Sequence, residues 1–264
     1  MRRRAEPVLA STMNFPSGRV DGALLALRLR KLGWVSRRRS RWALLRRGVA
    51  PSLEHADLLG GRHFETVVDI GANLGQFAIW AKEALGARRV VCVDPLPDTG
   101  VQLKATAAHI DQCRIEIVNA ALGSRRRNQT LHITAASDSS SLLAVSAIHG
   151  ERGALREVAT HEVDVLVGDD VLLELAPLER PLLIKIDVQG SEIDVLQGLA
   201  MVLTDADAVL VEVSFADIYV GQSNASSVIQ VMLDSGFALT GIARVPGSRP
   251  TWNLDQADLL FERH

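Results

Sequence analysis

Residues 66–76 read Thr-Val-Val-Asp-Ile-Gly-Ala-Asn-Leu-Gly-Gln, and this stretch decides the fold. It begins as a short apolar run rich in β-branched residues, breaks at Gly71, and continues into an apolar segment with helical spacing. The pattern predicts a buried strand, a tight turn and a helix over 74–85. Gly71 and Gly75 allow a sharp turn and a close approach to a bound molecule, where a Cβ would collide. Because the helix N-terminus offers free N–H groups and a positive dipole end, an anionic or carboxylate-bearing cofactor is expected here.

Strands and helices alternate on both sides of this turn. The predicted strands are 66–70, 89–94, 114–119, 182–187, 208–214, 237–243 and 257–262, and the predicted helices are 74–85, 98–109, 191–203 and 224–235. A β-α-β-α-β order implies a parallel sheet with right-handed crossovers. The last two strands have no helix between them, which indicates an antiparallel hairpin at one edge. The expected fold class is therefore α/β and Rossmann-like, with a mostly parallel seven-stranded sheet and an antiparallel C-terminal edge.

The middle of the chain is less regular. Residues 129–134 and 158–165 alternate between apolar and polar side chains, which is typical of half-buried strands. The serine-rich segment 137–141 between them reads as a loop, and a short helix is expected near 169–175.

Composition excludes several classes of protein. A hydrophobic share of 47% and a charged share of 23% are ordinary for a globular protein, and aromatic residues make up only 4%. So few aromatic residues disfavour a stacking surface for nucleic acid. The two cysteines and seven histidines show no metal-ligand spacing, so no bound metal is expected. No apolar run approaches the length of a membrane span, and Glu6 and Pro7 interrupt any signal-peptide core, so a cytoplasmic location is expected.

The N-terminal part of the chain is strongly basic. Residues 1–50 contain 13 Lys+Arg and 2 Asp+Glu, whereas the rest contains 16 and 29. Leucines at helical spacing predict one or two helices between residues 20 and 48, broken near Gly33 or Ser36. We therefore expect a basic helical extension, residues 1–60, before a main domain of residues 61–264. The extension either packs its basic face on the acidic main domain or contacts an anionic membrane or an anionic substrate carrier.

Four acidic residues follow or end predicted strands, namely Asp69, Asp94, Asp187 and Glu212. Ligands of open α/β sheets bind beyond the carboxyl ends of the strands, so these four define a candidate site. Asp94 lies 23 positions after Gly71, close to the ~20 expected for an acid that binds ribose hydroxyls. NAD and S-adenosylmethionine both fit that role. The spacing Gly-x-Asn-x-Gly lacks the third glycine of the dinucleotide pattern, and this absence and the two-strand ending favour S-adenosylmethionine.

A second block, residues 185–192, reads Lys-Ile-Asp-Val-Gln-Gly-Ser-Glu. The period of two places Lys185 and Asp187 on the same face of the sheet, either as a structural ion pair or as part of the site. Gly190 permits a turn, and Ser191 is expected to cap the following helix.

The chain resembles the FkbM family of S-adenosylmethionine-dependent methyltransferases over about residues 64–263. The resemblance rests on segments 68–76, 118–123, 139–142, 184–192 and 256–261. It implies a Rossmann-like methyltransferase fold and methyl transfer to a hydroxyl of a sugar or polyketide. One departure is Ser191, where many relatives carry an aromatic residue, so the acceptor pocket is expected to differ.

The resemblance also implies roles for individual residues. Asp69, Gly71, Asn73 and Gly75, with Gln76 beside them, would line the methionine end of the cofactor. Asp94 would hold the ribose, and Asn119 with Ala120 would flank the adenine.

A hydroxyl acceptor must lose its proton, which requires a general base. Asp187 is the first candidate and Glu212 the second. The serine loop around Ser140 and Ser141 is expected to close over the acceptor.

Two rival functions stay open. An NAD-linked oxidoreductase would need a catalytic set, and Tyr219 has no lysine four positions on. The second rival is a non-catalytic module that binds the cofactor without methyl transfer. A nucleic-acid acceptor is disfavoured because Asp187 is not followed by the Pro-Pro-aromatic segment of base methyltransferases.

Overall fold

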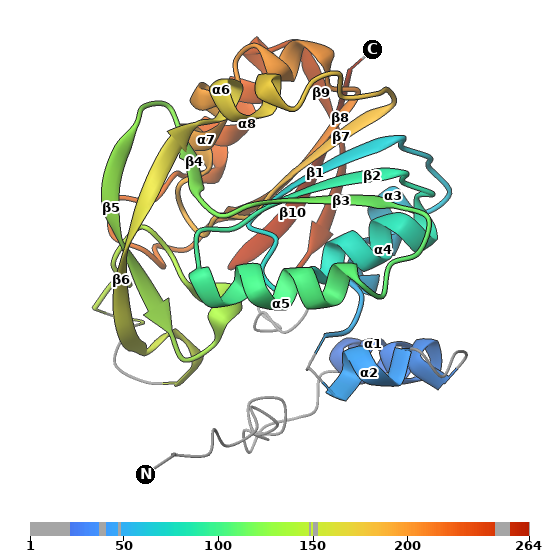
Figure 1. Ribbon diagram of the computed structural model, residues 1–264. Coiled ribbons are helices and arrows are strands. Elements are labelled where there is room, and N and C mark those ends of the chain that lie inside the picture. Colours follow the sequence, from blue (N-terminus) through green and yellow to red (C-terminus); the bar gives the residue numbers. More distant parts are fainter. Residues whose placement is uncertain are drawn as a thin grey trace.

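The computed structural model describes residues 22–36, 41–46, 49–147, 149, 153–245 and 254–263. Its centre is a seven-stranded sheet in the order β3-β2-β1-β7-β8-β10-β9 (Figure 1). In that order the strands are Arg114–Val118, Arg89–Val93, Thr66–Ile70, Leu182–Ile186, Ala208–Ser214, Gln256–Arg263 and Phe237–Arg244. The first five strands run parallel, and β10 is antiparallel to both of its neighbours. The predicted mostly parallel sheet with an antiparallel C-terminal edge is confirmed.

Helices cover both faces of this sheet. One apolar core lies under α3 (Ala56–Leu59), α4 (Gln76–Ala84) and α5 (Pro97–Ala107), and the other under α6 (Gly168–Glu174), α7 (Glu192–Gly198) and α8 (Ala225–Asp234) (Figure 1). All five residues of β1 and of β7 are buried, as expected for central parallel strands. The middle of the sheet is therefore a rigid platform, and its carboxyl edge carries the loops.

A smaller sheet stands beside the main one. It contains β4 (Ala121–Gly123), β6 (Glu157–Val167) and β5 (Arg127–Thr134), in that order. The sequence predicted the two long strands, but not that they form a separate sheet. The turn η2 (Ser137–Ser139) follows β5, and Ser141 returns to pair with His132. Since β4 continues the chain from β3, this sheet holds the serine loop next to the carboxyl edge of the main sheet.

Every predicted helix differs by at least one residue from its bounds in the structure, and the difference is informative for two of them. The helix expected over 74–85 begins at Gln76, because Gly75 is left-handed, with φ of 86°. The helix expected over 191–203 ends at Gly198 and is followed by the short turn η4 (Val202–Asp205). Gly198 packs on Gly123, whose carbonyl oxygen would lie 2.1 Å from an added Cβ. This backbone contact with β4 marks the end of α7.

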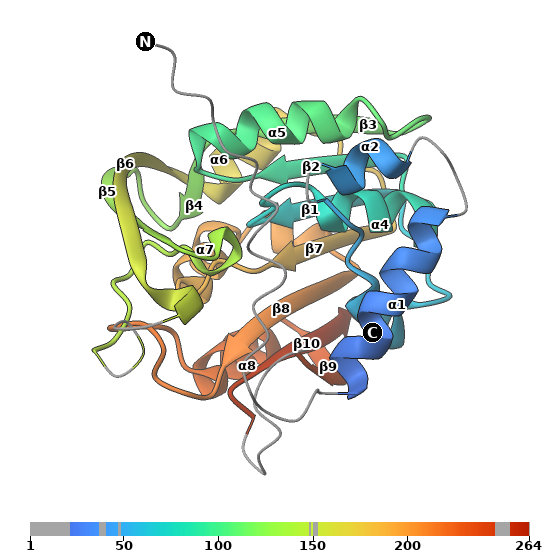
Figure 2. The ribbon, with the colours of Figure 1, turned by 90° about the horizontal axis from the view of Figure 1, so that it is seen from below.

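The N-terminal extension packs on the main domain. Helix α1 (Gly22–Ser36) ends where the break was predicted, and α2 (Arg41–Arg46) and η1 (Leu53–His55) follow (Figure 2). Trp34, Leu44 and Val49 form a small core with Ile79 of α4. The arginine cluster 37–39 lies outside the described residues. No helix in the described ranges has the length and apolar character that crossing a bilayer requires.

Two left-handed glycines provide a test of the contact between β1 and β7. A Cβ on Gly71 would lie 1.8 Å from the carbonyl oxygen of Asp187, whereas Gly61, with nearly the same φ, has open space around it. We expect Gly61→Ala to cost about 1 kcal/mol from backbone strain alone, and Gly71→Ala to cost about 3 kcal/mol or more. Urea unfolding of both variants measures the difference. Equal losses would mean that the close approach at Gly71 is not a constraint.

Candidate active site

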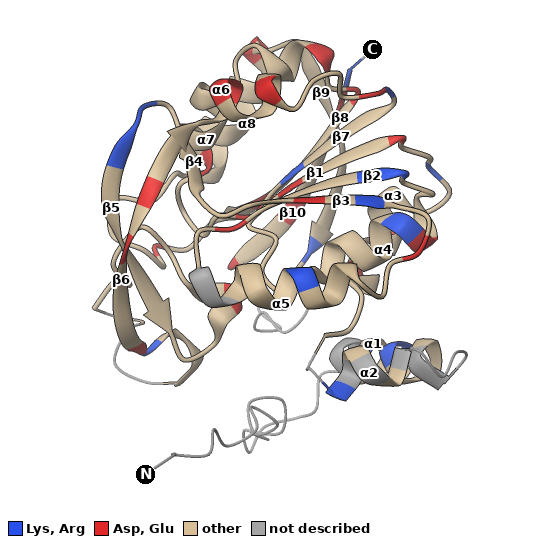
Figure 3. Ribbon diagram, viewed as in Figure 1, with Lys and Arg blue, Asp and Glu red and all other residues tan. Residues whose placement is uncertain are grey.

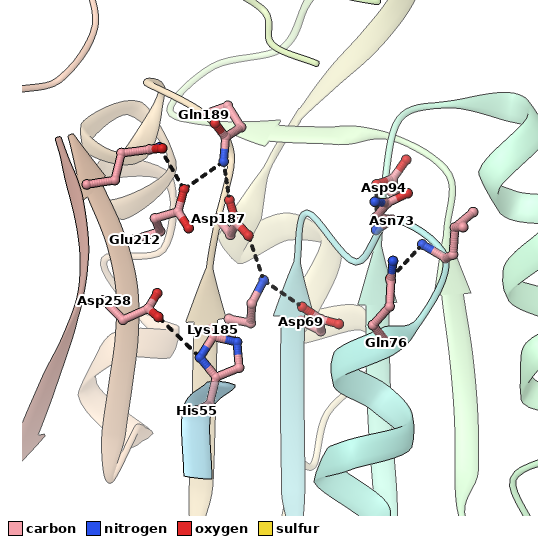
Figure 4. A network of polar contacts seen from close by, with 12 residues as sticks. His55, Asp69, Asn73, Gln76, Asp94, Lys185, Asp187, Gln189, Glu212 and Asp258 are labelled. Atoms are coloured by element: carbon pink, nitrogen blue, oxygen red, sulfur yellow. Dashed lines mark hydrogen bonds and ion pairs between the residues drawn. The ribbon is translucent and has the colours of Figure 1, made fainter. Parts of the chain in front are cut away.

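Lys185 joins two acidic side chains beneath the carboxyl edge of the sheet. The β1–β7 register places it directly beside Asp69. Its Nζ lies 3.4 Å from Asp69 Oδ1 and 3.3 Å from Asp187 Oδ2 (Figure 4). Lys185 thus pairs both along its own strand, with Asp187, and across to β1, with Asp69. The ammonium also lies 5.6 Å from the centre of the Phe77 ring.

The pKa values of this group follow from burial and charge. Burial by itself lowers the pKa of Lys185, but the carboxylates of Asp187, Asp69 and Glu212 outweigh it, so the pKa lies above its ordinary value. Burial raises the pKa of Asp69, and Lys185 opposes that rise. Lys185 is therefore charged at neutral pH and is the cation that permits buried carboxylates here.

Asp94 holds the glycine loop in place. Its Oδ2 accepts a hydrogen bond from Asn73 N at 2.9 Å, and its Oδ1 accepts from Leu96 N at 3.0 Å and Thr99 Oγ1 at 2.6 Å. Burial raises the pKa of Asp94, and these three hydrogen bonds oppose the rise. Asn73 has a positive φ of 46°, and its buried Oδ1 has no hydrogen-bond partner among the described residues. That amide oxygen can accept a hydrogen bond from a ligand.

Gln189 connects the two candidate bases. Its Nε2 donates to Asp187 Oδ1 at 2.7 Å and to Glu212 Oε1 at 2.8 Å (Figure 4). Gln256 donates a second hydrogen bond to the same oxygen of Glu212. Burial raises the pKa of Glu212 well above its ordinary value, and the charges of Asp187 and Asp258 add to the rise. Glu212 therefore holds a proton more tightly than an ordinary glutamate.

Tyr219 fixes Gln189 from the other side. Its hydroxyl lies 3.0 Å from Gln189 Oε1 and 2.8 Å from the carbonyl oxygen of Ser139. Ser141 Oγ donates to the backbone oxygen of Gln189 at 2.6 Å. The serine loop and the block 185–192 are thus hydrogen-bonded to each other.

The prediction that the Ser191 side chain caps α7 is wrong. Ser191 occupies the N-cap position, but its side chain makes no capping hydrogen bond. Ser223 Oγ accepts from Ile193 N at 3.1 Å instead. Ser191 still lies in the wall of the cavity described next.

A cavity of about 440 Å³ opens above these groups. Its walls come from the glycine loop, the serine loop, the block 185–192, β10 and two residues of α1, Leu27 and Lys31. The lining contains seven carboxylate side chains and two lysines, and the carboxylates are Glu54, Asp69, Asp94, Asp138, Asp187, Glu212 and Asp258. Acidic residues also mark the carboxyl edge of the sheet in Figure 3. Such a cavity favours a ligand with positive charge.

The structure brings most of the predicted site residues together. The cavity is lined by Asp69, Gly71, Asn73, Gln76, Asp94, Ala120, Asp187 and Glu212. Gly75 and Asn119 are not part of the lining. Gly75 turns the chain behind the loop, and Asn119 Nδ2 donates to the backbone oxygens of Asp94 and Leu96 at 2.9 and 3.1 Å.

Sequence reasoning missed several polar residues of the site. Gln189 stands inside the quoted block, and its positive φ of 55° makes it unusual. Tyr219, Gln256 and His55, which lies 3.3 Å from Asp258, contact partners far away in the sequence. No local pattern marks such residues.

Residues 69–239 match the family model described as the Methyltransferase FkbM domain, about two thirds of the chain. The chain belongs to the FkbM methyltransferase family. Members of this family use S-adenosylmethionine as methyl donor, so the resemblance seen in the sequence is confirmed.

Two curated relatives are similar over half of the chain. One is "Methyltransferase 1" of Beauveria bassiana, 28% identical over 145 residues, which are 50% of this chain and 57% of that protein. The other is "AMB antimetabolite synthetase AmbE" of Pseudomonas aeruginosa, 26% identical over 160 residues, which are 50% of this chain and 8% of that protein. The chain therefore spans less than two thirds of the length of either relative.

Among solved structures, the magnesium protoporphyrin IX methyltransferase of Synechocystis with bound S-adenosylmethionine is 11% identical, with a TM-score of 0.43. The match covers 94% of this chain and 87% of that one.

The site fits S-adenosylmethionine on its own chemistry. Gly71 and Asn73 form a turn with positive φ at both residues, and a side chain at Gly71 would fill the space beside the Asp187 backbone. The unpartnered Asn73 Oδ1 and the excess of carboxylates suit a cofactor that carries ammonium and sulfonium groups.

The buried ion pair predicts a stability change that depends on pH. Lys185→Met leaves the fully buried Asp69 beside no cation, which costs about 3–5 kcal/mol when Asp69 is ionised. The folded-state pKa of Asp69 is already raised, and removal of Lys185 raises it further. The loss should therefore be larger at pH 8 than at pH 5, because Asp69 takes up a proton more readily as the pH falls. Urea unfolding at both pH values measures this, with Lys104→Met as an exposed control. A loss that does not vary with pH would contradict the assignment.

Glu192 gives a second pH test. It is buried and accepts from Gly190 N at 2.7 Å, and burial, opposed by backbone hydrogen bonds, raises its pKa to about 7. The folded state thus keeps a proton that the unfolded chain releases at lower pH, so stability falls as pH rises toward 7, by roughly 3 kcal/mol.

Glu192→Gln keeps a side-chain oxygen that accepts the hydrogen bond from Gly190 N, and it removes the titrating carboxyl group. Relative to the native protein, it should gain stability between pH 5 and pH 8, measured by urea unfolding. A constant difference across this range would show that Glu192 titrates normally.

Proposed function

We propose that the protein is an S-adenosylmethionine-dependent O-methyltransferase whose acceptor is a hydroxyl of a sugar, a glycan or a secondary metabolite. The observation that carries the proposal is that the side-chain amide of Gln189 donates hydrogen bonds to both Asp187 and Glu212. All three residues line the same cavity as the glycine loop. A hydroxyl needs a base close to the methyl donor, and these carboxylates supply it.

The residues of the cavity have separate roles in this proposal. S-adenosylmethionine, when bound, supplies an electrophilic methyl group on its sulfonium. Gly71, Asn73 and Gln76 bind its methionine end, and Asp69 contributes negative charge from below. Asp94 accepts hydrogen bonds from the ribose, for which Oδ2 has room because, among the described residues, only Asn73 N donates to it. Ala120 lies against the adenine, and Asn119 acts indirectly by holding the Asp94–Leu96 turn.

Asp187 is the proposed general base. Its side chain is 26% exposed and lines the cavity, so an acceptor can reach it. Lys185 and Gln189 fix its orientation, which aligns the acceptor oxygen with the methyl group. Glu212 is the alternative base, because it lines the same cavity and accepts a hydrogen bond from the same Gln189 amide as Asp187.

The rival functions are weaker. Membership of a methyltransferase family disfavours an NAD-linked oxidoreductase. A cofactor-binding module without turnover would have no need for the Asp187–Gln189–Glu212 arrangement. We also propose the cytoplasm as location, since Cys92 and Cys113 are both free thiols.

Variants of the two carboxylates test the proposal. Formation of S-adenosylhomocysteine is measured over a panel of sugars, glycans and hydroxylated metabolites. With an active acceptor, Asp187→Asn should lower kcat by about 10²–10⁴-fold, as expected for loss of a general base. Its affinity for S-adenosylhomocysteine should change less than threefold.

Two further variants complete the comparison. Asp170→Asn removes an exposed carboxylate far from the cavity, paired with Arg126, and should leave kcat unchanged. Glu212→Gln should lower kcat less than Asp187→Asn. The reverse order would transfer the role of base to Glu212, and no turnover with any hydroxyl would reject the proposed acceptor class.

A further inference from the structure

Helix α1 has two apolar faces, and only one of them is used by the fold. The inner face carries Leu27, Lys31 and Trp34. Trp34 is buried against Ile79, Lys31 pairs with Glu54 at 3.0 Å, and Leu27 lines the cavity.

The outer face carries Leu25, Leu29 and Leu32, which are 48%, 60% and 55% exposed. At 3.6 residues per turn, these three side chains leave the helix within roughly 60° of one another. Three large apolar side chains in a row on one exposed face indicate a binding surface rather than random exposure. Trp42 on the neighbouring helix α2 is 49% exposed as well.

Arginines stand on both sides of this leucine row. On the helical wheel, Arg28 lies about 40° beyond Leu32 on one side of the row, and Arg30 lies about 100° beyond Leu29 on the other side. Both are exposed, as is Arg46 on α2. The sequence adds Arg37, Arg38, Arg39 and Arg41, and residues 1–50 contain only two acids. A leucine row between arginines, with a tryptophan nearby, is the pattern of a helix that lies in the surface of an anionic bilayer.

We propose that the outer face of α1 docks the protein on an anionic membrane surface. Charge decides between this occupant and a second copy of the chain, because two copies meeting at this face would bring their arginines together. The inner face of the same helix lines the cavity, so docking brings the cavity within about one helix diameter, ~10 Å, of the lipid headgroups. The proposal concerns binding and does not depend on the proposed acceptor.

Vesicle sedimentation of the full chain tests the proposal. The probes are vesicles of phosphatidylcholine alone and vesicles with 30 mol% phosphatidylserine. The native protein should bind the anionic vesicles at least tenfold more strongly, and 0.5 M NaCl should remove most of that difference. Arg28→Gln/Arg30→Gln should weaken binding to anionic vesicles roughly fivefold per arginine.

The leucine row is tested by Leu25→Glu/Leu29→Glu, which should lower vesicle binding at least tenfold. Its matched control is Met201→Glu/Leu233→Glu, which adds the same charge at two exposed apolar side chains outside α1, one beside η4 and one on α8, a helix that lies away from α1 in Figure 1. The control should bind within twofold of the native protein. The melting temperature and the affinity for S-adenosylhomocysteine of each variant show whether it is folded.

Three results would overturn the proposal. The first is equal binding to neutral and anionic vesicles. The second is equal loss in the leucine variant and its control, which would reflect charge alone. The third is self-association of the native protein that the leucine variant abolishes while vesicle binding is absent, which would assign the face to a second copy.

Discussion

The parallel pairing of β1 with β7 is the constraint on which the site depends. It places the ammonium of Lys185 between the carboxylates of Asp69 and Asp187, all within 3.4 Å of the nitrogen. A buried carboxylate without a cation would lose its charge, so these groups require one another. The same pairing brings the Asp187 backbone against Gly71, and Asp187 N continues the ladder to Ile70 at 3.0 Å. The glycine loop and the proposed base are therefore held by one pair of strands.

Charge in the cavity also suits the proposed reaction. Burial raises the pKa of Glu212, and the charges of Asp187 and Asp258 add to the rise, while Lys185 is a cation beside this group. An excess of carboxylates attracts a donor that carries positive charge on sulfur. Methyl transfer removes that charge, so the attraction weakens for the product, which favours its release.

Much of the fold followed from local patterns. The apolar runs, the glycine turn and the two adjacent closing strands specify the main sheet and its edge, because burial on both faces leaves a clear signature. Patterns of this kind could not show that β5 and β6 form a sheet of their own, since pairing across more than 20 residues has no local signal. The close packing of Gly198, the last residue of α7, on Gly123 was hidden for the same reason, because the two glycines lie far apart in the sequence.

The site was predictable in part for the same physical reasons. Strand ends and glycine turns placed Asp69, Asp94, Asp187 and Glu212 at one edge of the sheet. Tyr219 and Gln256 contribute through contacts 30 and 44 residues away in sequence, so only the folded chain shows their role.

The most direct test of the account is calorimetric titration of S-adenosylhomocysteine and, separately, of NAD into the native protein and Asp94→Asn. The substitution keeps an acceptor oxygen for the loop but removes the charge that the ribose hydroxyls would contact. We predict binding of S-adenosylhomocysteine only, weakened at least tenfold by the substitution. Binding of NAD, or equal affinity of both proteins for S-adenosylhomocysteine, would contradict the assignment of the glycine loop and Asp94 to the methyl donor.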